Sequence, residues 1–147
     1  MKIAIITARG GSKRIPRKNI RNFCGQPIMA YSIQAALQAN CFDEVMVSTD
    51  DSEIAEIARD YGAKVPFIRS AATANDYAVT ADVILEVLSE YRKNNIFPEL
   101  VCCIYPTAPF ITPENLLSAL NILEKNKHIT SVNPFVNFSY PIQVRKS

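Results

Sequence analysis

A cluster of basic residues and glycines near the start of the chain has the composition of an anion-binding loop. Arg9, Lys13 and Lys18 surround the pair Gly10-Gly11, directly after the apolar run at residues 3–6. Glycines let backbone N–H groups fold around an anion, while arginine and lysine supply the attraction. A loop of this kind after a buried strand favours a polyphosphate ligand.

The charge of the chain is distributed unevenly. It has 16 basic and 14 acidic residues, yet no acidic residue precedes Asp43. The alternative to a phosphate site is a solvated basic turn, or one that touches nucleic acid nonspecifically. Because no aromatic residues are interleaved in the loop to stack on bases, we expect no nucleic acid partner.

The common phosphate-binding motifs are absent from the sequence. The chain contains neither G-x-x-x-x-G-K-[ST] nor G-x-G-x-x-G. Their absence argues against a Walker-type ATPase and against an ordinary dinucleotide-binding protein.

Length and composition favour one globular domain, residues 1–147. The chain is 48% hydrophobic, which is enough for a core of its own. Its first apolar run is too short for a signal peptide, and no segment approaches the roughly 20 apolar residues of a membrane span. We therefore expect a cytoplasmic protein without a membrane partner.

The cysteines and the histidine do not form a metal-binding pattern. Cys24, Cys41, Cys102 and Cys103 include no C-x-x-C pair, and His128 is the only histidine. We expect reduced cysteines, with Cys102 and Cys103 on opposite faces of a strand, and no residue can be assigned to a metal.

Apolar runs alternate with helical patterns along the chain. Strands are expected at residues 3–8, 44–49, 65–68, 100–105 and 129–133. Helices are expected at residues 28–39, 52–61, 81–93 and 114–125, with Pro27, Asp50 or Asp51, Thr80 and Thr112-Pro113 at their starts. This alternation predicts an α/β, Rossmann-like, doubly wound fold with a mostly parallel sheet.

The predicted topology brings four loops to one edge of the sheet. Ligands of such folds bind beyond the carboxyl ends of the strands. The loops at residues 9–19, 49–51, 69–79 and 106–112 follow successive strands, so they are expected to share that edge. Tyr105 precedes the last loop, which two prolines stiffen and which offers aromatic and hydroxyl groups for a base or a sugar.

The ordered combination of these motifs resembles the cytidylyltransferases that activate nine-carbon sugar acids, a family that includes the acylneuraminate and pseudaminic acid enzymes. The resemblance covers essentially the whole chain. It is carried by the basic loop at residues 8–20, Val47-Ser48-Thr49-Asp50, Glu53-Ile54-Ala55, Tyr61-Gly62-Ala63, residues 65–69 and Pro106-Thr107-Ala108-Pro109.

The resemblance implies transfer of CMP from CTP to a nine-carbon sugar acid, with release of pyrophosphate and normally with Mg²⁺. It implies catalytic roles for Arg9, Lys13 and Lys18. The nucleotide-binding residues it implies are Arg9, Gly10, Gly11, Ser12, Lys13, Lys18, Asn19, Arg69, Ala78, Thr80 and Tyr105. Three of these have structural alternatives: Asn19 as a turn cap, Arg69 as a partner of Asp76, and Thr80 as a helix cap.

Two residues distinguish branches of the family. Arg14 and Tyr105 are similar to the pseudaminic acid branch, so pseudaminic acid is the expected acceptor. Lys18-Asn19 makes the Kdo branch a poorer match. A sialic or legionaminic acid enzyme remains an alternative, as does a nucleotide-binding fragment without activity.

Members of the family run longer than this chain. The resemblance implies that the C-terminal third is missing, together with the acidic pair that binds Mg²⁺ and most of the sugar-acid pocket. Residues 134–147 would begin a segment for dimerisation and sugar binding, and the full-length protein would be a homodimer. A chain of 147 residues is therefore expected to bind nucleotide but to turn over poorly.

Overall fold

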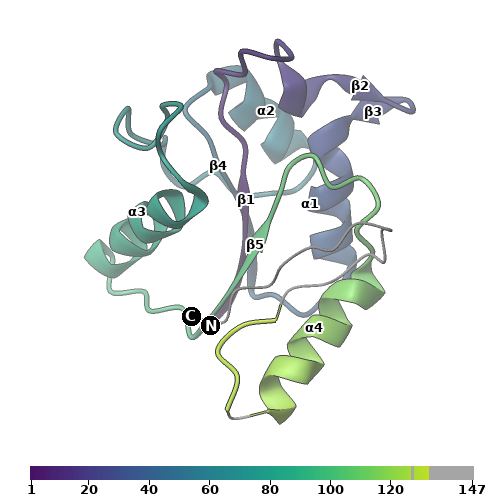
Figure 1. Ribbon diagram of the computed structural model, residues 1–147, viewed down its shortest axis with the longest axis vertical. Coiled ribbons are helices and arrows are strands. Elements are labelled where there is room, and N and C mark those ends of the chain that lie inside the picture. The colour runs from purple at the N-terminus through teal and green to yellow at the C-terminus, as the bar shows by residue number, and fades with distance from the viewer. Residues whose placement is uncertain (127, 133–147) are drawn as a thin grey trace.

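A parallel sheet of three strands forms the centre of the protein. The computed structural model describes residues 1–126 and 128–132. Its strands β1 (Lys2–Thr7), β4 (Glu44–Ser48) and β5 (Leu100–Ile104) lie in the order β4-β1-β5 (Figure 1). Ile3 of β1 lies opposite Glu44 on one side and Val101 on the other. The four inner residues of β1 are buried, as expected for a strand covered on both faces.

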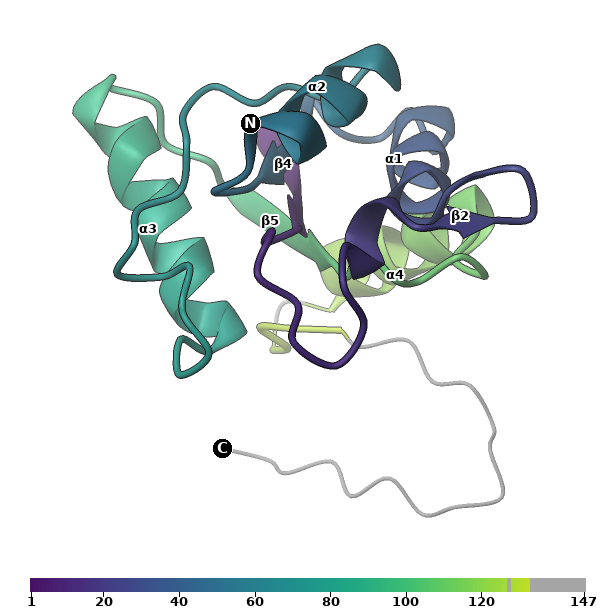
Figure 2. The same cartoon turned by 90° about the horizontal axis from the view of Figure 1, so that it is seen from above.

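Helices cover both faces of the sheet (Figure 2). α1 (Ile28–Gln38), α2 (Ser52–Asp60) and α4 (Pro113–Lys125) lie on one face, and α3 (Thr80–Lys93) lies on the other. Ala4 and Ile6 pack toward the three helices, whereas Ile3 and Ile5 pack toward α3. This alternation confirms the predicted doubly wound α/β fold.

A short 3-10 helix and a hairpin connect the basic loop to α1. The 3-10 helix η1 spans Lys18–Ile20, and β2 (Asn22–Phe23) pairs antiparallel with β3 (Gln26–Pro27). These small elements were not predicted from the sequence.

The helix ends largely follow the predicted caps. The Asp51 side chain accepts a hydrogen bond from Ile54 N, and the Thr112 hydroxyl accepts one from Asn115 N. The prediction for Thr80 as a cap is wrong. It is the first residue of α3, and the cap position is occupied by Val79, whose N–H donates to the carboxylate of Asp82 at 3.0 Å.

The strand predicted at residues 65–68 does not form. This segment runs beside β4, where Lys64 N donates to Val45 O and Arg69 N donates to Thr49 O. Lys64 forms an isolated bridge with Met46, and residues 65–68 form no strand. Pro66 lacks an N–H group, so the parallel ladder cannot continue across it.

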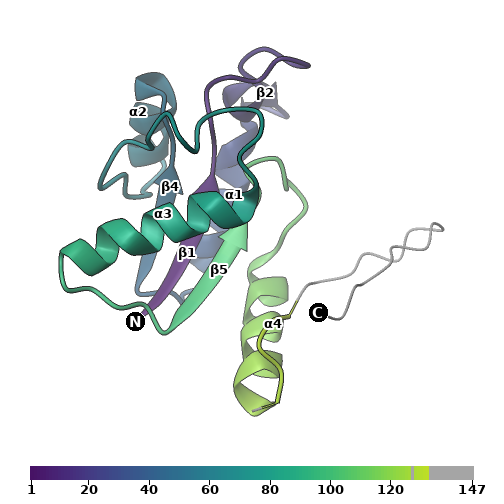
Figure 3. The same ribbon diagram turned by 60° about the vertical axis from the view of Figure 1, so that its left-hand side comes forward.

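The strand predicted at residues 129–133 is also not found where the structure describes it. Residues 129–132 form no strand, because the chain turns after α4 with Ile129 N donating to Asn126 O at 3.1 Å. Asn133 and the segment predicted at residues 134–147 lie outside the described residues. Figure 3 shows α4 beside β5, at the edge of the sheet.

The four cysteines are free, as predicted. Cys102 packs against the core and Cys103 is exposed, which agrees with opposite faces of β5. Among the described residues, no helix combines the length and the apolar composition that crossing a membrane requires.

Candidate functional site

The predicted site residues gather at the carboxyl edge of the sheet, at the top of Figure 1. A cavity of about 230 Å³ is lined by Arg9, Lys18, Asn19, Arg69, Ala78, Thr80 and Tyr105. A more open hollow of about 490 Å³ is lined by Arg9, Gly10, Gly11, Ser12 and Lys13. Every residue predicted to bind nucleotide therefore lines one of two adjoining hollows.

The start of the basic loop is fixed by contacts with the end of β4. Ala8 N donates to Ser48 O at 3.0 Å, and Gly10 N donates to Asp50 Oδ1 at 2.9 Å. A side chain at position 10 would not fit, because its Cβ would lie 2.6 Å from Asp51 Oδ2. Gly10 is therefore required by close packing rather than by an unusual backbone angle.

Asn19 is a buried amide that uses only part of its hydrogen-bonding capacity. Its side chain lies in the cavity wall, and the residue is 4% exposed. The Nδ2 group donates to Arg9 O at 2.9 Å, which fixes the orientation of the amide. The Oδ1 atom is buried and has no protein partner. A ligand donor in the cavity would satisfy this acceptor, because buried polar atoms in proteins are nearly always hydrogen-bonded.

Arg69 places a buried positive charge in the same wall. It is 5% exposed and donates to Ser48 Oγ at 3.0 Å and to Ser48 O at 2.5 Å. Burial lowers the pKa of Arg69, although Asp50 and Glu86 oppose this effect. The alternative that Arg69 pairs with Asp76 is wrong, since its guanidinium is bound to Ser48.

Asp76 pairs with two of the cations predicted to bind phosphate. Its Oδ1 lies 2.7 Å from Arg9 Nη2, and its Oδ2 lies 2.5 Å from Lys13 Nζ. Hydrogen bonds from Lys13 and then Arg9 lower the pKa of this carboxyl group. The loops that contain Asp76 and the two cations were expected to share one edge of the sheet, but these ion pairs were not predicted.

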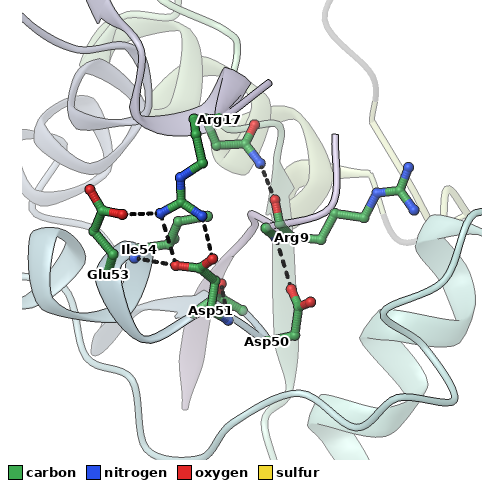
Figure 4. A network of polar contacts seen from close by, with 9 residues as sticks. Arg9, Arg17, Asp50, Asp51, Glu53 and Ile54 are labelled. Carbon is green, nitrogen blue, oxygen red and sulfur yellow. Dashed lines mark hydrogen bonds and ion pairs between the residues drawn. The ribbon is translucent and has the colours of Figure 1, made fainter. Parts of the chain in front are cut away.

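Arg17 belongs to a different network (Figure 4). Its guanidinium pairs with Asp51 and Glu53, and the hydrogen bond from Arg17 lowers the pKa of Asp51. The Arg9 side chain points away from this network in Figure 4. Arg17 therefore ties the basic loop to α2, whereas Arg9 faces the cavity.

Tyr105 and Lys18 complete the cavity from two other elements. The carbonyl of Tyr105 accepts a hydrogen bond from Ser32 Oγ at 2.8 Å, which fixes the chain after β5. Its side chain is exposed. Lys18 is the first residue of η1, and it forms no ion pair among the described residues.

The described residues contain no preformed metal site. No group of three or more Asp, Glu, His or Cys side chains among them could hold a metal ion. The acids beside the basic loop are also engaged: Asp50 with Gly10 N, Asp51 with Arg17, and Asp76 with two cations. His128 is exposed.

Comparisons with known proteins agree with the geometry of the site. A family model described as "Cytidylyltransferase" matches residues 3–144. The chain is 43% identical over 143 residues to the pseudaminic acid cytidylyltransferase of Campylobacter jejuni. The aligned residues cover 96% of this chain and 60% of that protein. It is 40% identical over 133 residues to the CMP-N,N'-diacetyllegionaminic acid synthase of Legionella pneumophila, covering 90% of this chain and 57% of that protein.

Solved structures show the same fold. CMP:2-keto-3-deoxy-manno-octonic acid synthetase in complex with CTP matches with a TM-score of 0.72 and 25% identity, over 88% of this chain and 50% of that one. A cytidylyltransferase from Leptospira borgpetersenii matches with a TM-score of 0.68 and 24% identity, over 87% and 51%. The chain thus spans about 60% or less of the length of these relatives.

Proposed function

Because this chain belongs to the cytidylyltransferase family, we propose that the protein transfers CMP from CTP to a nine-carbon sugar acid. Pseudaminic acid is the acceptor we favour, since the relative with 43% identity acts on it by name. Legionaminic or another sialic-type acid is the alternative, because the legionaminic acid synthase is 40% identical.

The observation that best supports nucleotide binding is that cationic side chains and a buried hydrogen-bond acceptor without a protein partner line the same cavity. Arg9 and Lys18 line the same cavity as Asn19, whose Oδ1 has no protein partner. A nucleoside triphosphate offers both complementary features: phosphate oxygens for the cations and hydrogen-bond donors for the amide oxygen.

The proposed reaction assigns charge stabilisation to the basic loop. The anomeric hydroxyl of the acceptor attacks the α-phosphorus of CTP and loses its proton to water, the bond to the oxygen that bridges the α- and β-phosphates breaks, and pyrophosphate leaves with that electron pair. Arg9, Lys13 and Lys18 would hold the phosphate oxygens on which negative charge increases, together with N–H groups of residues 10–12.

The base and ribose would occupy the inner cavity. Asn19 would accept a hydrogen bond there, while Arg69, Ala78 and Thr80 would border the base and the ribose. Tyr105 would provide an aromatic face at the rim. All of these residues line the same cavity.

Mg²⁺ is implied by the family resemblance, but we assign it to no described residue, because no group of three or more metal-binding side chains is present among them. We also propose a cytoplasmic location, a homodimer for the longer protein, and no nucleic acid or membrane partner.

The test combines nucleotide binding with product formation. Calorimetry with CTP, UTP and ATP should show a preference for CTP, since a pocket that pairs with cytosine leaves polar atoms unpaired with another base. Pyrophosphate release with CTP and Mg²⁺ should then be highest with pseudaminic acid among pseudaminic, legionaminic and N-acetylneuraminic acids. Equal binding of ATP and CTP would contradict the proposal.

A nucleotide-binding role without transfer is the second candidate for this chain. It is favoured by the lack, among the described residues, of a group of three or more side chains that could hold a metal ion. Tight CTP binding without pyrophosphate release with any of the three acceptors would support it.

A further inference from the structure

We propose that Asp76 determines polyphosphate affinity by competing with the ligand for Arg9 and Lys13. In the free protein its carboxylate holds these two cations, and it must release them when a polyphosphate binds. The proposal rests on the proposed function only in taking the ligand of the basic loop to be a polyphosphate.

The ion pairs place a carboxylate where phosphate oxygens are expected. Each oxygen of Asp76 contacts one cation, at 2.7 Å for Arg9 and 2.5 Å for Lys13. The Asp76 side chain is 34% exposed and the Lys13 side chain is 83% exposed. An ion pair this open to water is weak enough for a multiply charged ligand to displace.

Asp76 also stands between the two hollows of the site. Arg9, Asn75 and Asp76 line both the inner cavity and the outer hollow, so they form the wall that separates them. A nucleotide with its base near Asn19 and its phosphates along residues 10–13 has to cross this wall. Movement of the Asp76 side chain away from Arg9 would open that path.

The loop that carries Asp76 is held by contacts that do not involve its carboxylate. Glu86 accepts hydrogen bonds from Ser70 N at 2.8 Å and from the Thr73 hydroxyl. Asn75 Oδ1 accepts from Tyr77 N and Ala78 N at 2.8 and 2.9 Å. Removal of the Asp76 charge should therefore leave the loop in place.

Competition of this kind affects only ligands that need the two cations. A polyphosphate binds only the state in which Arg9 and Lys13 are not paired with Asp76. Because that state is only partly populated in the free protein, the apparent affinity for the polyphosphate is lower. Cytidine carries no phosphate, so its binding in the inner cavity should not change. The same competition would favour release of pyrophosphate.

The experiment compares Asp76→Asn with wild type by calorimetry at fixed ionic strength. The probes are inorganic tripolyphosphate, CTP and cytidine. We expect Asp76→Asn to bind tripolyphosphate and CTP about three- to tenfold more tightly, from the loss of two partly exposed ion pairs, and to bind cytidine as wild type does. The control is Asp60→Asn, which removes the same charge from an exposed position at the end of α2 and should change none of the affinities.

A double-mutant cycle with Lys13→Ala tests the direct contact. Lys13→Ala should reduce tripolyphosphate affinity more in the Asp76→Asn background than in wild type, because only there is Lys13 free for the ligand. Unchanged or weaker tripolyphosphate binding by Asp76→Asn would overturn the proposal, as would strictly additive effects in the cycle. Tripolyphosphate has no base and reacts with no acceptor, so these results do not depend on nucleotide preference or on CMP transfer.

Discussion

Asn19 and Arg69 are polar side chains buried in the cavity wall, where each would cost free energy without a partner. Arg69 donates hydrogen bonds to Ser48, whereas Asn19 Oδ1 has no protein partner. Their types and their order in the chain could be recognised from the sequence. Their burial could not, because it depends on loops that come together only in the fold.

The first prediction concerns Asn19→Ala. The variant loses the bond from Nδ2 to Arg9 O, so the free energy of unfolding should fall by about 1 kcal/mol. CTP affinity should also fall, since the acceptor for the ligand is gone. Urea denaturation and calorimetry measure the two effects, with Asn121→Ala on the exposed side of α4 as control. Unchanged CTP affinity in Asn19→Ala would remove Asn19 from the site.

A second prediction separates two arginines of the same loop. Arg9→Ala should weaken CTP binding by about 1.5 to 3 kcal/mol if it makes a charge-assisted bond with phosphate. Arg14→Ala removes the same charge from an exposed position that does not line either hollow, so its effect should be small. Calorimetry at two salt concentrations distinguishes contact from general attraction. Equal losses in the two variants would indicate attraction by the loop as a whole.

At the scale of elements, α2 joins the basic loop to the sheet. Asp51 caps this helix through Ile54 N and also pairs with Arg17. The hydrogen bond from Arg17 lowers the pKa of Asp51 below its ordinary 3.8. A carboxyl group whose pKa is lower in the folded state stabilises the fold at pH values above its ordinary pKa. This stabilisation is lost as the pH falls through the pKa of the folded state.

The third prediction follows from this lowered pKa of Asp51. Asp51→Asn keeps a capping side chain but loses the ion pair, so at pH 7 it should be about 0.5 to 1 kcal/mol less stable than wild type, a small value because Arg17 is partly exposed. The difference should shrink as the pH falls below 3.8. Urea denaturation across this range measures it, and a difference independent of pH would contradict the assigned cause. Asp51→Ala should lose about 1 kcal/mol more, since it also removes the cap.

Elements were predictable from the sequence where local signals agreed with packing. The run at β1 and the cap signals at Asp51 and Thr112 gave correct positions, because each acts within a few residues. Pro66 shows the limit: the apolar pattern around it indicates a strand, but pairing with β4 requires an N–H group that proline lacks. The partners of Asp76 were missed although both loops were expected at the same edge of the sheet, because the sequence does not show which side chains meet there.

At the scale of the whole molecule, the sheet has one open edge among residues 1–126 and 128–132. Within them β5 pairs only with β1, so its other edge carries unpaired backbone groups. A groove of about 270 Å³ lies beside it, lined largely by apolar residues of β5 and α4 that include Leu100, Ile104, Leu116 and Leu120. Open strand edges next to apolar surface favour pairing between chains.

The fourth prediction is that this chain self-associates through β5 and that Cys103→Lys weakens the association. Cys103 is exposed on β5, and a lysine there would place a charge that a paired strand from another molecule has to desolvate. Sedimentation velocity under reducing conditions, over a range of protein concentrations, should show the variant shifted toward monomer. Cys24→Lys makes the same change at an exposed position in the β2–β3 turn, outside β5, and should behave as wild type. If both lysine variants shift equally, repulsion from added charge explains the result. If neither shifts, the edge of β5 is not where the chains meet.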